Sequence, residues 1–172
     1  RLLPTRVGLD ALGAVPGTGA VDGVAPLVLG IEETRLGPLL LHPRKESHLY
    51  LYGDAQSGKT TFLRSLAREI MRTNTPKSAQ IFAVDVRRSL LGEIPEEYLA
   101  GYMTTREEAE SQLGDLAAYL RGRLPGDQVT TDQLRNRSWW TGAEAWVLVD
   151  DYDLVATRSG NPVAVLQPLM AQ

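Results

Sequence analysis

The architecture of this chain follows from one short segment, Gly53-Asp54-Ala55-Gln56-Ser57-Gly58-Lys59-Thr60. It fits the P-loop pattern G-x-x-x-x-G-K-[ST] at every fixed position. Glycines let such a loop curl until successive backbone N–H groups point inward at phosphate oxygens. The lysine reaches the β- and γ-phosphates, and the final hydroxyl binds magnesium. The segment therefore predicts a site for ATP with Mg²⁺.

The flanks of this loop have the pattern that such a site needs. The apolar run from His48 to Tyr52 predicts a strand before the loop, and Lys59 to Met71 predicts an amphipathic helix after it. The helix would offer its positive N-terminal end to phosphate. The alternative is a glycine-rich turn without a ligand, which this context disfavours. The predicted nucleotide-binding residues are Gly53, Asp54, Ala55, Gln56, Ser57, Gly58, Lys59, Thr60 and Thr61, with Thr60 also a magnesium ligand.

A second candidate element is the buried strand Trp146 to Val149, which ends in Asp150 and Asp151. A carboxylate at the end of such a strand can hold magnesium, usually through water. We assign Asp150 to this role, the alternative being a carboxylate that caps the next turn.

Asp151 is the candidate catalytic residue, since it stands where many ATPases of this plan carry a glutamate that activates water. Aspartate is one methylene shorter, and a positioning error of about 1 Å can cost about 100-fold in rate. A solvated or capping carboxylate is an equally good interpretation of Asp151.

The rest of the pattern predicts an α/β fold of the P-loop NTPase class, with a mostly parallel sheet and flanking helices. Thr105 and Glu108 have capping-box spacing and open a second amphipathic helix. We expect residues 1–23 to form a lead-in or linker, and residues 24–172 to form the front part of one domain whose sheet would continue beyond the last residue. The other expected elements are a hairpin or two edge strands at Val24 to Ile31 and Leu39 to Leu41, a buried strand at Ile81 to Val84, a loop or short helix at Asp127 to Gly142, and a helix beginning at Pro162.

Composition limits the possible functions. The net charge of −3 and pI of about 5.4 give no electrostatic footprint for nucleic acid. The absence of cysteine excludes disulfides and thiolate metal sites. No apolar run approaches the roughly 20 residues that span a bilayer, so we expect membrane association only through other segments or chains.

Several further residues admit two interpretations. Arg87 and Arg88 follow the strand Ile81 to Val84, where an arginine could contact phosphate or a neighbouring subunit's nucleotide, although a surface salt bridge is favoured. His42 and His48 are isolated and indicate no metal site. Trp139 and Trp140 could form a partner-binding knob, but core packing is favoured.

Read together, these segments resemble the FtsK/SpoIIIE-type ATPase modules of EccC, the motor of mycobacterial ESX (type VII) secretion systems. The likeness covers nearly the whole chain and is greatest for the last of the tandem modules. The segments that carry it are Leu3 to Leu9, Leu39-Leu40-Leu41-His42-Pro43, His48 to Thr60, Asp85-Val86-Arg87-Arg88-Ser89-Leu90-Leu91 and Val149-Asp150-Asp151-Tyr152-Asp153.

The resemblance implies a RecA/FtsK-like fold and a cytoplasmic ATPase module, peripheral to the inner membrane, in a membrane-anchored hexamer. Its partners would be neighbouring ATPase modules, the ESX membrane complex and exported EsxA/EsxB-like proteins. The roles of Gly53 through Thr60 and of Asp150 carry over. Two departures, Asp150-Asp151 for Asp-Glu and Asp85-Val86-Arg87 for Asp-Pro-Lys, argue against fast hydrolysis and against DNA translocation.

Two other classes of protein remain open at this stage. A small-molecule kinase also uses a P-loop, but it needs an acceptor pocket and a lid. A nucleotide-binding scaffold that never hydrolyses ATP has the same sequence signature as a slow ATPase.

Overall fold

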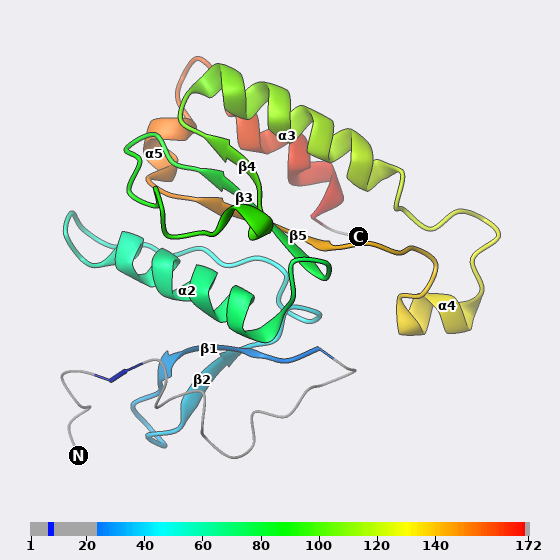
Figure 1. Cartoon of the computed structure of the whole chain (residues 1–172), viewed down its shortest axis with the longest axis horizontal. Helices are drawn as coiled ribbons and strands as arrows, with labels where there is room; N and C mark the ends of the chain where they lie inside the picture. The colour runs from blue at the N-terminus through cyan, green and yellow to red at the C-terminus, as the bar shows by residue number, and fades with distance from the viewer. Residues whose placement is uncertain (1–6, 9–23, 171–172) are drawn as a thin grey trace. The chain divides into compact units, whose positions relative to one another are not determined.

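In the computed structural model, residues 7–8 and 24–170 can be described, and the chain divides into two compact units (Figure 1). The N-terminal unit is Arg1–Thr75 and the C-terminal unit is Pro76–Gln172. The predicted lead-in over residues 1–23 lies outside the described residues, apart from positions 7 and 8.

The N-terminal unit contains a β-hairpin, as the sequence predicted. Strand β1 (Leu27–Ile31) pairs antiparallel with β2 (Pro38–Leu41), and Leu27 lies opposite Leu41. The Glu32 N–H donates to the Gly37 carbonyl at 2.9 Å and closes the connecting turn. Leu27, Val28 and Leu41 are buried, so the hairpin contributes an apolar face to its unit.

Helix α2 (Lys59–Thr73) follows the P-loop segment and packs against β1. Its apolar residues recur at helical spacing, and Leu66, Ala67 and Ile70 form the buried stripe. The predicted amphipathic helix is therefore confirmed.

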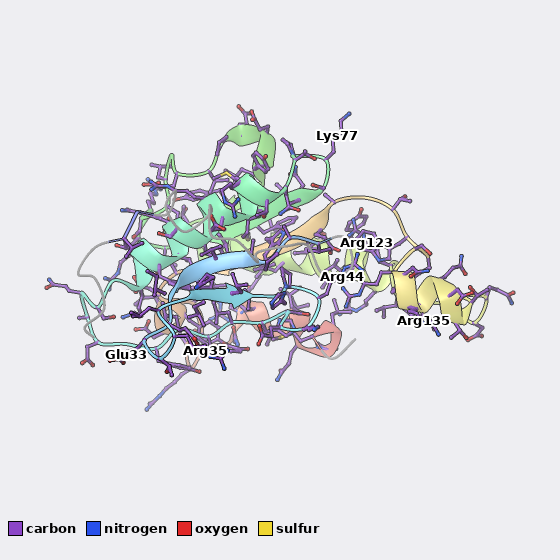
Figure 2. The ribbon with its side chains drawn as sticks, turned by 90° about the horizontal axis from the view of Figure 1, so that it is seen from below. Glu33, Arg35, Arg44, Lys77, Arg123 and Arg135 are labelled. Atoms are coloured by element: carbon purple, nitrogen blue, oxygen red, sulfur yellow. The ribbon has the colours of Figure 1, made fainter. Side chains whose placement is uncertain are left out.

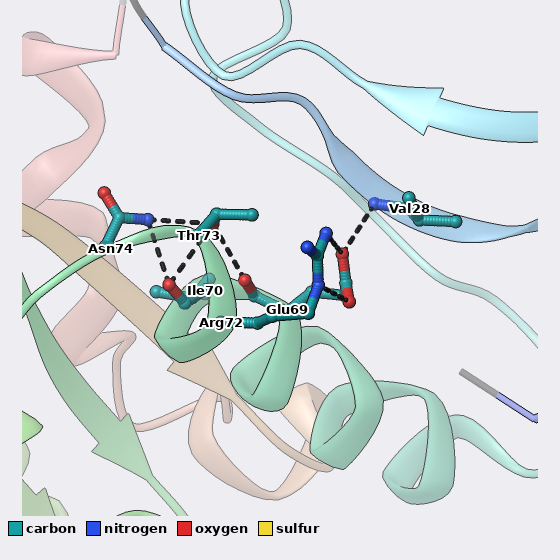
Figure 3. Close-up of polar contacts among 6 residues, drawn as sticks. All are labelled: Val28, Glu69, Ile70, Arg72, Thr73 and Asn74. Atoms are coloured by element: carbon teal, nitrogen blue, oxygen red, sulfur yellow. Dashed lines mark hydrogen bonds and ion pairs between the residues drawn. The ribbon is translucent and has the colours of Figure 1, made fainter. Parts of the chain in front are cut away.

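A buried carboxylate joins α2 to the hairpin (Figure 3). Glu69 is fully buried, and its Oε2 accepts the Val28 N–H of β1 at 3.1 Å. The Arg72 guanidinium donates to both carboxylate oxygens, at 2.7 and 2.8 Å. Burial raises the pKa of Glu69, but the hydrogen bonds from Arg72 and Val28 and the Arg72 charge lower it by a larger amount. The pKa of Glu69 therefore lies below its ordinary value. The ionised carboxylate thus fixes the helix to the strand.

Glu69→Gln is expected to lower the free energy of unfolding by about 1–3 kcal/mol at pH 7, because the charge-assisted bonds from Arg72 are lost. Since the folded pKa is depressed, the stabilisation by Glu69 is present above the unfolded pKa and is lost as pH falls through the folded pKa. Denaturant titrations from about pH 7 to pH 3 should therefore show a steeper decline for the wild type than for the variant. The matched control is Glu32→Gln, which removes a carboxylate paired with Arg35 on the exposed surface. Parallel pH profiles for the wild type and Glu69→Gln would contradict this role.

The predicted strand from His48 to Tyr52 is wrong for this structure. These residues form no regular element, and no described strand pairs with them. Tyr50 and Tyr52 are 62% and 87% exposed and stack on each other with ring centroids 6.5 Å apart. An apolar pattern alone does not make a strand, because the backbone N–H and C=O groups also need a neighbouring strand.

The C-terminal unit holds a parallel three-stranded sheet in the order β4-β3-β5. Its strands are β3 (Ala79–Val84), β4 (Leu99–Met103) and β5 (Glu144–Val149). The two predicted strands are confirmed as β3 and β5, each a little longer than expected. Strand β3 is mostly buried, as predicted, whereas Leu148 is the one buried residue of β5. Strand β4, which follows the short 3-10 helix η1 (Glu96–Tyr98), was not predicted.

Two helical segments pack on each other beside this sheet, α3 (Arg106–Arg121) and η2 (Pro162–Leu169). Thr105 and Glu108 form the predicted capping box at the start of α3. The helix expected from Pro162 is instead a 3-10 helix, and Pro168 within it lacks the N–H that an α-helical turn needs. The core of the unit consists of Val84, Met103, Ala109, Leu113, Leu116, Ala117, Val155 and Leu166.

The stretch between α3 and β5 is mostly loop, with the short helix α4 (Thr131–Asn136). Arg123, which is labelled in Figure 2, fixes one end of this stretch. Its guanidinium lies 4.4 Å from the ring centre of Tyr119 and 4.3 Å from that of Trp140. Trp139 donates to the Arg123 carbonyl at 2.7 Å. The two tryptophans are half-buried and anchor the loop, so the expected core packing holds only in part.

Candidate functional site

The P-loop segment is a tight loop in which two residues, Gln56 and Gly58, adopt left-handed backbone conformations. Gly58 has φ 91° and ψ 12°, in the left-handed region that glycine tolerates best, and Gln56 has φ 61°. A Cβ on Gly53 would lie 2.5 Å from Ser57 Oγ, so a side chain at this position would displace the Ser57 hydroxyl. The Ser57 N–H donates to the Asp54 carbonyl at 3.2 Å. The left-handed φ of Gly58 therefore favours glycine strongly, and Gly53 leaves space for the Ser57 side chain.

Helix α2 begins without a side-chain cap and without an acidic residue in its first turn. Helix α3 begins with a complete capping box and with Glu107 and Glu108 in its first turn. The first N–H groups of a helix attract anions, and an acidic or capping side chain normally satisfies them. The start of α2 has instead the character of a phosphate-binding terminus.

Lys59 already holds the loop together. Its Nζ donates to the carbonyl oxygens of Gly53 and Asp54, both at 2.8 Å. An ammonium group has three donors, and carbonyl acceptors of this kind can be exchanged for phosphate oxygens of higher charge. Thr60 follows at the start of α2 and is half-buried, while Thr61 is exposed. The residues that are present therefore fit a triphosphate.

The second group of predicted residues lies at the carboxyl edge of the parallel sheet. Val84 pairs with Val149, so Asp85 and Asp150 leave neighbouring strands at the same level. Asp150 is 4% exposed, and its N–H donates to the Val84 carbonyl at 3.0 Å. Its Oδ1 accepts the Asp151 N–H at 3.2 Å. This edge is where open α/β sheets bind ligands.

Asp85 organises the loop after β3. It is fully buried and accepts the N–H groups of Ser89 at 2.9 Å and Leu90 at 2.6 Å. Tyr102 of β4 donates its hydroxyl to the same carboxylate at 2.7 Å. Burial, together with this bond to Asp85, raises the pKa of the Tyr102 phenol well above its usual range. Sequence reasoning placed Asp85 at this edge but missed Tyr102, because β4 was missed.

Asp151 lies against Arg87. Arg87 Nε is 3.2 Å from Asp151 Oδ2, with the arginine side chain 65% exposed and the aspartate side chain 21% exposed. The favoured interpretation of Arg87 as a salt-bridge residue is thus confirmed. Asp151 has φ 48° and ψ 58° and precedes the short helix α5 (Tyr152–Val155).

The structure thus gathers the predicted residues into two groups. Residues 53–61 lie together at the start of α2 in the N-terminal unit, and Asp150 and Asp151 lie together at the sheet edge in the C-terminal unit. Across residues 7–8 and 24–170, no three acidic or histidine side chains cluster as a metal site would require. Within those same ranges, no helix is both long and apolar enough to cross a membrane.

A G-x-x-x-x-G-K-T loop that opens a helix, in a chain whose parallel sheet carries acidic residues at its carboxyl edge, is the fold of a P-loop ATPase domain. Comparison with known proteins makes this class more specific. The chain is 43% identical over 165 residues to the ESX-4 secretion system protein EccC4 of Mycobacterium tuberculosis, a match that covers 96% of this chain and 13% of EccC4. No protein-family model matches the sequence.

Solved structures agree with this match. The cytoplasmic domain of the type VII secretion ATPase EccC from Thermomonospora curvata superposes with a TM-score of 0.89 at 36% identity, over 100% of this chain and 19% of that one. ATPases 2 and 3 of the same protein, in complex with a signal sequence peptide, give a TM-score of 0.89 at 35% identity, over 100% of this chain and 30% of that one. The chain belongs to the family of EccC ATPase modules of ESX secretion systems. It spans only a small part of the length of these relatives.

Proposed function

We propose that this chain is a module of a type VII secretion motor that binds MgATP and hydrolyses it slowly. The observation that supports this most is the uncapped start of α2, beside a loop whose lysine donates, within the described part of the chain, to exchangeable carbonyl oxygens. Such a site favours the triphosphate of a nucleotide. The homology to EccC ATPases supports the assignment to a secretion motor.

Each predicted residue has a distinct role in this proposal. The backbone N–H groups from Gly53 to Thr61 surround the phosphates, and Lys59 exchanges the carbonyls of Gly53 and Asp54 for β- and γ-phosphate oxygens. The Thr60 hydroxyl would bind magnesium, and the proposed role of Asp150 is also that of a magnesium ligand, most simply through water. Bound magnesium would neutralise charge on the phosphate oxygens. Asp151 is the candidate base, and its short side chain suits it poorly to that role.

The module acts together with other parts of the secretion system. We propose neighbouring ATPase modules of a hexameric motor, the ESX membrane complex and small helical EsxA/EsxB-like substrates as partners. The module would be the last of the tandem ATPase modules, entered through residues 1–23, with residues 24–172 as the front part of its domain. It would lie in the cytoplasm and be peripheral to the inner membrane through that complex.

A protein substrate, rather than DNA, is the expected macromolecular partner of the parent protein. The net charge of −3 disfavours a surface that neutralises many phosphates, and such surfaces lose affinity steeply as salt rises. The intact parent protein should therefore bind an EsxB-like protein in a titration in which duplex DNA binds only weakly. Tight DNA binding that falls steeply between about 50 and 200 mM salt would contradict the secretion assignment.

The two other classes make different predictions. A small-molecule kinase would transfer the γ-phosphate to one of a panel of nucleosides and nucleotides. A non-hydrolysing scaffold would bind ATP with the same affinity as we propose but would release no phosphate. Measuring both products in one assay distinguishes the three.

A further inference from the structure

The loop after β3 holds Arg87 at a defined place. The buried Asp85 carboxylate accepts three hydrogen bonds, from the Ser89 and Leu90 N–H groups and from the Tyr102 hydroxyl. These bonds fix the loop immediately beyond Arg87, and Leu90 is buried at 1% exposure. The loop also begins at Asp85, whose N–H donates to the Met103 carbonyl at 2.8 Å. The backbone of Arg87 is therefore anchored on both sides although its side chain is exposed.

Asp151 forms an ion pair with this arginine and does not cap the helix that follows it. It is the N-cap residue of α5, where an aspartate normally accepts a backbone N–H from the first turn. No such side-chain bond is made. The carboxylate Oδ2 lies 3.2 Å from Arg87 Nε instead. The backbone of Asp151 has a φ of 48°, in the left-handed region that residues other than glycine seldom adopt.

A carboxylate that activates or orients water must accept a hydrogen bond from that water. A guanidinium on one of its oxygens occupies an acceptor site and neutralises its charge. The geometry points to Arg87 as a positioning residue that restrains Asp151, so that release of this pair permits Asp151 to act on the attacking water. The inference rests on the proposed ATPase function and adds the residue that regulates its chemistry.

The exposure of the pair sets the size of the effect. The Arg87 side chain is 65% exposed, and exposed pairs change an equilibrium by at most about fivefold. Such a restraint is weak enough to be released by a competing anion, such as a phosphate or a carboxylate of a neighbouring module. It therefore suits reversible regulation better than permanent inactivation.

The test is a steady-state ATPase assay on the intact parent protein at saturating MgATP, with Arg87→Ala, Arg87→Lys, Asp151→Asn and the double variant Arg87→Ala/Asp151→Asn. Arg87→Ala should raise kcat about threefold to fivefold with KM changed less than twofold. Arg87→Lys should retain most of the restraint, because it keeps the charge. The gain should vanish in the Asp151→Asn background. The matched control is Arg135→Ala on α4, which removes another exposed Arg–Asp pair of the same unit and should leave kcat unchanged (Figure 2).

An unchanged or lower kcat in Arg87→Ala would overturn the inference. So would the absence of turnover in both the wild type and Arg87→Ala. The same gain in kcat from Arg87→Ala in the Asp151→Asn background would also overturn it. Calorimetric titration of the wild type and Arg87→Ala with MgATP distinguishes this failure from failure of the proposed function. Absent binding in the wild type would refute the ATPase assignment itself. If both proteins bind MgATP and kcat is unchanged in Arg87→Ala, the proposed role of Arg87 is refuted while the ATPase assignment stands.

Discussion

Lys59→Ala is expected to lower the affinity for MgATP by about 100-fold or more, because two charge-assisted hydrogen bonds to phosphate are lost. The fold should survive. In the described structure Lys59 donates only to the Gly53 and Asp54 carbonyls, in an exposed loop where each bond contributes about 1 kcal/mol or less. Isothermal titration with MgATP measures the affinity, and thermal unfolding without nucleotide checks the fold.

The matched control for this prediction is Lys77→Ala, which removes another lysine on the exposed surface (Figure 2). It should leave the affinity for MgATP unchanged. If Lys59→Ala binds as tightly as the wild type, then the loop is not the nucleotide site. If both variants lose affinity equally, the effect is one of general charge and the assignment also fails.

The features that could be predicted from the sequence are those set by local chemistry. The P-loop pattern is complete within a few residues, and its glycines suit the left-handed φ of Gly58 and the close approach of the Ser57 side chain to Gly53. The capping box of Thr105 and Glu108 likewise depends only on neighbours along a helix. Such features need no partner from elsewhere in the chain.

The features that were missed depend on distant partners. Strand β4 contains Gly101, and glycine normally weakens a strand prediction. Here a Cβ at Gly101 would lie 2.5 Å from Gln112 Oε1 and 3.1 Å from the Phe82 ring, so close packing of these side chains favours the glycine. The segment from His48 to Tyr52 shows the converse error, since its pattern favours a strand but none of the described strands pairs with it. The Arg87–Asp151 pair also joins two distant loops that no local pattern connects.

The same pair bears on the rate of ATP hydrolysis, which we expect to be slow in the wild type. In our proposal the binding of MgATP depends on Lys59, Thr60 and Asp150, whereas hydrolysis also needs a water aligned with the γ-phosphorus. Bound ATP can still stabilise one arrangement of modules by mass action, by about 2.7 kcal/mol at 100 times Kd. Slow turnover is therefore compatible with a regulatory use of ATP.

Asp151→Glu is expected to raise kcat by about 10-fold to 100-fold, because the added methylene brings the carboxylate closer to the attacking water. Asp151→Asn should change the slow wild-type rate little. The replacement has a cost, since Asp151 has φ 48° and glutamate is less tolerant of that region than aspartate, so the variant should unfold at slightly lower temperature.

Phosphate release at saturating MgATP, measured on the intact parent protein, gives the rates. If the glutamate side chain of Asp151→Glu still pairs with Arg87, the double variant Arg87→Ala/Asp151→Glu should have a higher kcat than Asp151→Glu alone. Wild-type turnover of many per second that is abolished by Asp151→Asn would show instead that aspartate is a competent base here, and that the short side chain does not limit the reaction.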